Sequence, residues 1–127
     1  MLISVSDFND RFVLTMTALP VGKDFAVTLS GGEPPHIGAV AVAQPRPSLK
    51  KDGSISSTAS VIALVGHKED MLARKVALHM AKELQTVVSV SCGVHLDDVT
   101  EEEIQQILEL SDSLMHMLIA KAREIES

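Results

Sequence analysis

The segment RFVLTMTALPVGKDFAVTLS, residues 11–30, decides the fold that we expect for this chain. Every second side chain from residue 12 onward is apolar or small, and these side chains share one face of a strand: Phe12, Leu14, Met16 and Ala18. The alternation resumes at residues 24–30, after a turn at residues 20–23. The segment therefore predicts an antiparallel hairpin with one face against a core.

Further strands and a helix are expected on the C-terminal side of this hairpin. Residues 37–43 and 56–65 predict two more strands, and residues 45–53 predict a loop between them. The period then changes, and the apolar side chains of residues 69–84 recur at helical spacing. They form one stripe: Leu72, Val76, Ala77, Met80, Ala81 and Leu84.

A β-branched strand and a long helix complete the expected elements. Residues 86–91 predict the strand, and Thr100 with Glu103 forms a capping box that opens the helix. At 1.5 Å per residue the helix is about 38 Å long, which exceeds what one small sheet can cover. The part of the helix that the sheet does not cover therefore favours a homodimer contact. Its apolar side chains include Leu114, Met115, Met117 and Leu118. The alternative is that these residues complete the monomer core.

The order β-β-β-β-α-β-α predicts an α+β fold, a mainly antiparallel sheet with two helices packed on one face. We expect one domain over residues 1–127, because this length supports a single core and not two. A net charge of −6 and the absence of Trp and Tyr argue against a nucleic-acid partner. The apolar runs are too short for a membrane span. One cysteine suits the reducing cytoplasm.

Three histidines stand in short polar motifs at the expected strand ends. They are His36 in GGEPPHIG (31–38), His67 in GHKED (66–70) and His95 in CGVHLDD (92–98). The GHKED motif joins a strand to a helix, where backbone N–H groups and the helix dipole suit an anion. It lacks the glycine and Lys-Ser/Thr pattern of a Walker A loop, and a plain capping turn is an equal alternative.

The CGVHLDD motif allows two kinds of chemistry. Cys92 and His95 could both bind a metal or form a nucleophile pair, but the second cysteine pair of a usual zinc site is missing. We favour the interpretation of Cys92 as a small buried hydrophobe. His79 and His116 fall within helices and are expected at the surface or core edge.

Taken together, the three motifs resemble the LpdD-like prenylated flavin chaperones, small proteins that belong to bacterial hydroxyarylic-acid (gallate-type) decarboxylase systems. The resemblance runs from about Arg11 to the last helix. It implies a non-catalytic protein that binds prenylated FMN and helps to mature a UbiD-type decarboxylase, after a UbiX-type prenyltransferase has made the cofactor. It also implies a fold like that of the proteasome-assembly chaperones, which commonly dimerise.

Carried over by position, the resemblance puts the flavin near the three motifs, with its phosphate at the helix start. The expected cofactor-binding residues are His36, Ile37, Gly66, His67, Lys68, Glu69, Cys92, Gly93 and His95. A divalent metal ion held by His36, His67 and His95 is a further hypothesis. The motifs contain no aromatic residue to stack on the ring, so Ile37, Val94, Leu96 or a dimer partner has to supply apolar surface.

Two other classes of function stay open. One is a small metal-dependent enzyme with His36, His67 and His95 as ligands and Asp97 or Glu33 as base. The other is an assembly chaperone without a ligand, in which the three motifs are only turns.

Overall fold

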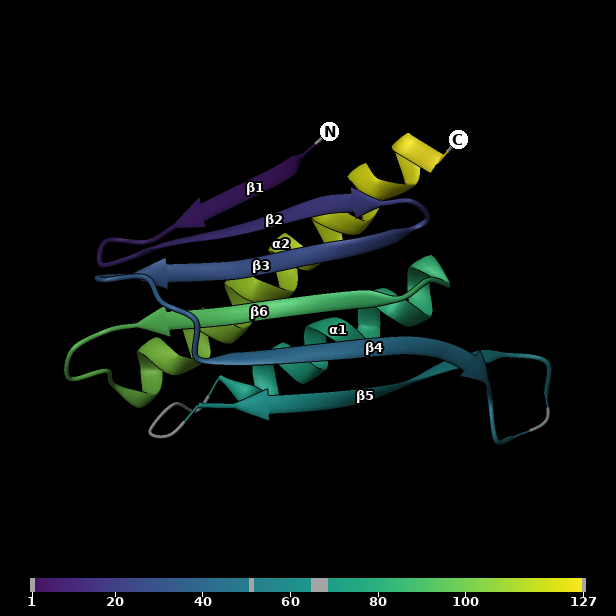
Figure 1. Ribbon diagram of the computed structural model, residues 1–127. Coiled ribbons are helices and arrows are strands. Elements are labelled where there is room, and N and C mark those ends of the chain that lie inside the picture. The colour runs from purple at the N-terminus through teal and green to yellow at the C-terminus, as the bar shows by residue number, and fades with distance from the viewer. Residues whose placement is uncertain (1, 51, 65–68, 127) are drawn as a thin grey trace.

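A computed structural model of the chain describes residues 2–50, 52–64 and 69–126. Six strands form one sheet in the order β1-β2-β3-β6-β4-β5 (Figure 1). Neighbouring strands are antiparallel except β3 and β6, which are parallel. The strands are β1 (Ile3–Phe8), β2 (Val13–Val21), β3 (Asp24–Gly32), β4 (Ala39–Pro47), β5 (Ile55–Ala63) and β6 (Val88–His95).

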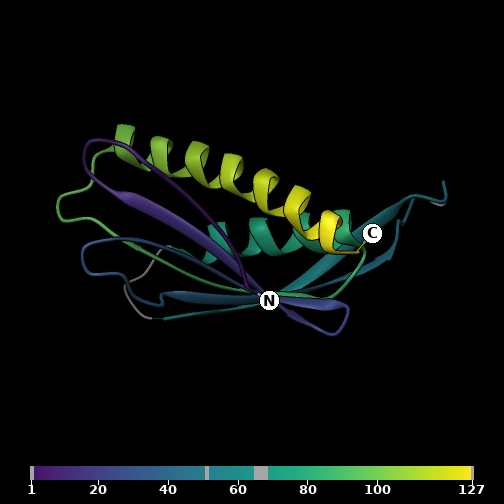
Figure 2. The same cartoon turned by 90° about the horizontal axis from the view of Figure 1, so that it is seen from above.

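Both helices cover the same face of the sheet, as Figure 2 shows. Helix α1 (Asp70–Leu84) packs on β4, β5 and β6, whereas α2 (Glu101–Glu126) packs on β1 and β2. The predicted α+β class, with a mainly antiparallel sheet and two helices on one face, is confirmed. In the described part of the chain, neither helix is long and apolar enough to cross a membrane.

The hairpin predicted at residues 11–30 forms as β2 and β3. Val21 pairs with Asp24 across a turn in which Gly22 has a φ of +61°, a conformation that favours glycine. The alternating side chains point toward the helices as expected, and Leu14, Met16, Val27 and Leu29 are fully buried or nearly so. Period-two patterning therefore decided which face of this hairpin enters the core.

The capping box at the start of α2 is also confirmed. The Thr100 hydroxyl accepts from the Glu103 N–H at 3.1 Å, and the Glu103 carboxylate accepts from the Thr100 N–H at 3.1 Å. Helix α1 ends at Gln85, which adopts the left-handed conformation at φ 52° and donates its N–H to the Ala81 carbonyl.

The core between sheet and helices takes up most of the apolar stripe of α2. Leu114, Met115 and Leu118 are buried inside the single chain, whereas Met117 is half exposed. The interpretation that these residues complete the monomer core is thus correct for three of the four. Of these four residues, only Met117 is exposed enough to contact a second copy of the chain.

The structure differs from the sequence-based prediction at β1 and at β4. Strand β1 was not predicted; its Ile3 and Val5 are buried against the core beneath α2. The predicted loop at 45–53 begins later, because β4 continues through Pro47. Beyond Ala43 this strand pairs with β5 and no longer with β6. Because proline has no N–H to donate, its prolines are tolerated where hydrogen bonds to β6 are not needed.

Candidate functional site

A pocket of about 450 Å³ lies at the end of the sheet where β6 stops and both helices start. In Figure 1 the loops around the arrowhead of β6 and the first turns of α1 and α2 converge there. Apolar side chains make up most of its wall, and two histidines and one carboxylate stand among them. The lining residues are His36, Glu69, Met71, Leu72, Val94, His95, Leu96, Val99, Ile104, Ile107 and Leu108.

The polar side chains of the pocket are joined to one another. His36 Nε2 lies 3.1 Å from Oε1 of Glu69, the residue that precedes α1. The rings of His36 and His95 meet edge to face with centroids 5.8 Å apart. His95 Nε2 in turn lies 3.0 Å from Asp97 Oδ1. Two imidazoles, each held by a carboxylate, therefore form one polar patch in an otherwise apolar wall.

Two glycines allow the polar segments to approach so closely. A Cβ atom at Gly93 would collide with the His36 carbonyl, and one at Gly32 would collide with the His95 carbonyl. The Gly38 N–H donates to the Cys92 carbonyl at 2.8 Å, which ties the loop before β4 to β6. The glycines of the GGEPPHIG and CGVHLDD motifs thus serve backbone contact, which explains why they accompany the histidines.

Cys92 does not present its thiol to the pocket. It is fully buried in β6, between Leu29 of β3 and Ala39 of β4. Burial, and then the negative charge of Glu69, raises the pKa of the Cys92 thiol to about 12. The thiol is therefore protonated at neutral pH and behaves as the small buried hydrophobe that we expected.

The structure brings some of the predicted site residues together. His36, Glu69 and His95 line the pocket, and Gly93 supports the His36 backbone. Ile37 is 58% exposed and lies outside the pocket wall, whereas Val94 and Leu96 belong to it. The other three predicted residues, Gly66, His67 and Lys68, lie outside the described residues, and so does the anion site predicted there.

The metal hypothesis involves His67 and so extends beyond the described part of the chain. Within that part, no group of three or more His, Cys, Asp or Glu side chains is arranged to hold a metal ion. Glu33, a candidate base, borders a separate hollow beside Arg11 and Phe12. Asp97, the other candidate base, is the hydrogen-bonding partner of His95.

The apolar wall, apart from Val94 and Leu96, is the part of the site that sequence reasoning missed. Leu72 was assigned to a helical core stripe, yet it lines the pocket together with Met71, Val99, Ile104, Ile107 and Leu108. The signal that could have found them was the length of the last helix, because its first turns extend past what the sheet can cover. Arg11 fixes this region by binding Glu103 at 3.0 Å and the Asp97 carbonyl.

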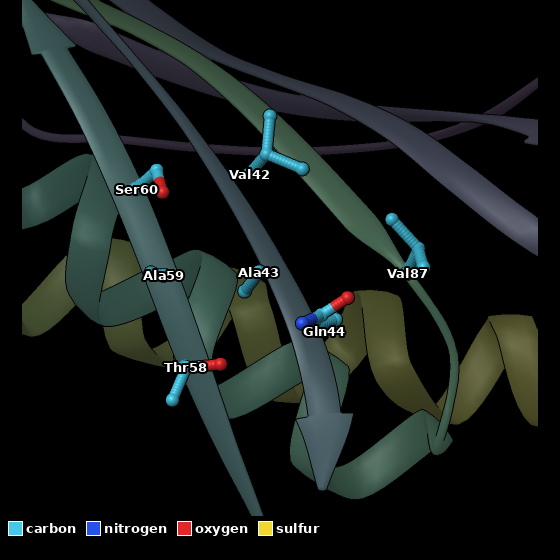
Figure 3. A pocket seen from close by; sticks show the side chains of 7 residues that line it. All are labelled: Val42, Ala43, Gln44, Thr58, Ala59, Ser60 and Val87. Atoms are coloured by element: carbon cyan, nitrogen blue, oxygen red, sulfur yellow. The ribbon is translucent and has the colours of Figure 1, made fainter.

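A second hollow, of about 250 Å³, lies on the opposite face of the sheet (Figure 3). Figure 3 shows both helices behind the strands that carry its side chains. Val42, Gln44, Ser60 and Val87 are among the lining residues, and no titratable side chain is among the described residues that line it. It is therefore a weaker candidate for a functional site than the pocket with the two histidines.

The fold and the pocket define a class, a small α+β domain with a largely apolar pocket between the end of the sheet and the starts of two helices. A family model described as "Prenylated flavin chaperone LpdD-like domain" matches residues 9–123, and the chain belongs to this family. The resemblance found in the three motifs is thereby confirmed.

Two similar proteins place the chain further. "Protein LpdD" of Lactiplantibacillus plantarum (strain ATCC BAA-793 / NCIMB 8826 / WCFS1) is 24% identical over 102 residues, covering 79% of this chain and 70% of that protein. A chain from the "Crystal Structure of a Novel Chaperone Complex for Yeast 20S Proteasome Assembly" has a TM-score of 0.53 at 13% identity, with 94% and 97% of the two chains covered. The second similarity concerns the fold only.

Proposed function

We propose that this protein is a non-catalytic carrier that holds prenylated FMN and assists the maturation of a UbiD-type aromatic-acid decarboxylase in the cytoplasm. The observation that carries the proposal is the pocket at the end of β6, with apolar walls and a histidine patch. Family membership names the class of ligand, and the single buried cysteine is compatible with a reducing compartment.

The pocket has the size and chemistry that such a ligand needs. Its volume of about 450 Å³ falls within the roughly 300–1,000 Å³ of common ligand sites. Val94, Leu96 and Ile107 would contact the flat ring, and His36 and His95 would bind polar groups of the cofactor. No Phe, Tyr or Trp is among the lining residues. Aliphatic contact without ring stacking favours release, which a carrier requires.

A catalytic role has less support from the residues of the pocket. The Cys92 thiol is buried and its pKa is raised to about 12, so it is a poor nucleophile. His36 and His95 already have carboxylate partners. The metal ion expected at His36, His67 and His95 stays a prediction, which elemental analysis of the purified protein with and without flavin tests.

The proposed partners are the UbiD-type decarboxylase, a UbiX-type prenyltransferase and a second copy of the chain. For the second copy we favour the face of the sheet away from the helices, named here the open sheet face. It carries exposed Val42, Val87 and Ile62. In the described strands, charged Lys, Arg, Asp and Glu occur only at Asp7, Asp24 and Arg46, near strand ends.

Flavin retention tests the carrier proposal directly. The chain has no Trp or Tyr, so bound flavin is seen by absorbance with little protein background. Reduced prenylated FMN is mixed anaerobically with protein and passed through gel filtration. We expect the wild type to retain flavin at tens of micromolar protein, and His36→Ala and His95→Ala to lose most of it. His116→Ala, a helix histidine away from the pocket lining, is the control.

The outcomes separate the three classes of function. Failure of the wild type to retain flavin would contradict the proposal that the protein is a flavin carrier. Retention that is equal in all three variants would place the flavin elsewhere than the pocket. A ligand-free assembly chaperone predicts that His36→Ala and His95→Ala bind protein partners as the wild type does.

A further inference from the structure

A third hollow, of about 600 Å³, follows the outward face of α1 and is named here the α1 groove. It shares Met71, Leu72 and Leu108 with the histidine pocket, so the two hollows are neighbours on one surface. The described residues that line it are Ser57, Met71, Leu72, Arg74, Lys75, Leu78, His79, Lys82 and Leu108.

The charge of the α1 groove is opposite to that of the whole chain. The chain has a net charge of −6, yet the described residues that line the groove include Arg74, Lys75 and Lys82 and no aspartate or glutamate. None of these three cations forms an ion pair within the described residues. By contrast, Arg11 and Arg123 have carboxylate partners. Unpaired cations gathered in an acidic protein attract an acidic partner.

Apolar side chains lie in the same stripe as the cations. Met71, Lys75, Leu78 and Lys82 recur at helical spacing, so they share one line along α1. Met71 is 79% exposed, which is a large apolar exposure for a helix that is otherwise well packed. Methionine adapts to irregular apolar surfaces and is frequent at sites that bind peptides. The groove can therefore bury apolar groups as well as neutralise charge.

We propose that the α1 groove docks a segment of a partner protein that carries carboxylates beside apolar side chains. The carboxylates meet Arg74, Lys75 and Lys82, and the apolar side chains cover Met71 and Leu78. A small anion would use the cations and leave the apolar part exposed. If the proposed function is right, the receiving decarboxylase is the natural partner, because docking here brings it next to the flavin pocket. The docking does not require flavin.

Binding of synthetic peptides to the full chain tests the proposal. The probe is a fluorescein-labelled 12-residue amphipathic helix built from Glu and Leu, measured by fluorescence anisotropy at low and high NaCl. Two matched peptides replace every Glu by Lys or every Leu by Ser. We expect only the Glu/Leu peptide to bind well, and more weakly at high salt because the charges are exposed.

Two triple variants with the same change of charge locate the binding. Arg74→Glu/Lys75→Glu/Lys82→Glu should weaken the Glu/Leu peptide at least about tenfold. Lys23→Glu/Lys50→Glu/Lys121→Glu, all exposed and outside the groove, should change it far less. Met71→Ser should also weaken binding. Equal losses in the two triple variants, or equal binding of the Glu/Leu and Glu/Ser peptides, would overturn the proposal.

Flavin retention by the same variants separates this proposal from the carrier function. The docking surface is supported if the Arg74, Lys75 and Lys82 triple variant loses the peptide but still retains flavin. It also stands if the wild type binds the peptide selectively but retains no flavin, in which case only the carrier function fails. Unchanged peptide binding by that triple variant overturns the docking surface, whatever happens to the flavin.

Discussion

His36 and His95 meet because glycines remove side chains from the contact between their loops. The sequence shows the histidines and the glycines, and its resemblance to the family implied that three motifs surround one ligand. It does not show that Gly93 lies under the His36 carbonyl or Gly32 beside that of His95. The contact of Gly32 depends on β6 lying parallel to β3, a long-range register that no local pattern contains. The carboxylate partner Glu69 was named, but its bond to His36 was not predicted.

Cys92 allows a prediction that depends only on its burial and its pKa. A pKa of about 12, against an ordinary 9.0, leaves roughly a thousandfold less thiolate at pH 8. We expect a thiol reagent such as 5,5′-dithiobis(2-nitrobenzoic acid) to label the native protein at least about a thousandfold more slowly than the protein in urea. Labelling at the unfolded rate in native buffer would contradict the burial.

The same shift in pKa gives the sign of a pH dependence. The folded protein keeps the Cys92 proton while the unfolded chain loses it above pH 9. Stability from this group is therefore complete below pH 9 and falls as the pH rises toward about 12.

At the scale of elements, the local patterns predicted most of the fold. The hairpin, both helices, the capping box and the strands at the motifs are confirmed, because apolar periodicity fixes which face is buried. Strand β1 was not predicted because a strand of six residues with two buried side chains gives only a weak alternation of apolar and polar residues. The prolines at 45 and 47 suggested a loop. They are tolerated in β4 because this part of the strand pairs with β5 on one side only.

The capping box of α2 links helix stability to the pocket. Thr100 caps the helix directly after the loop that contributes Leu96 and Val99 to the wall. We expect Thr100→Ala to lower the free energy of unfolding by about 1 kcal/mol, measured by urea denaturation. It should also weaken flavin retention, because the wall of the pocket loses its anchor. Ser113→Ala, exposed within the same helix, is the control and should cost a few tenths of a kcal/mol at most.

At the scale of the whole molecule, the surface has two sides: the side covered by the two helices and the open sheet face. The helix side carries the histidine pocket and the α1 groove side by side, so the proposed ligand and the proposed partner protein would bind on neighbouring surfaces. The open sheet face lies toward the viewer in Figure 1, and the described strands carry few charged side chains. The sequence predicted a dimer but assigned it to α2, because the burial of Leu114, Met115 and Leu118 depends on tertiary packing.

The open sheet face gives the prediction on which the oligomeric state depends. Six strands of six to nine residues span roughly 25 Å by 30 Å, close to the roughly 800 Å² that each partner buries in a standard interface. We expect the wild type to be a dimer in analytical ultracentrifugation at tens of micromolar. Val42→Lys/Val87→Lys should be a monomer, because two desolvated charges would face the same sheet in the partner. Leu49→Lys, at an exposed loop position, is the control and should leave the dimer intact. A monomeric wild type, or dissociation by Leu49→Lys as well, would rule out this face as the dimer interface.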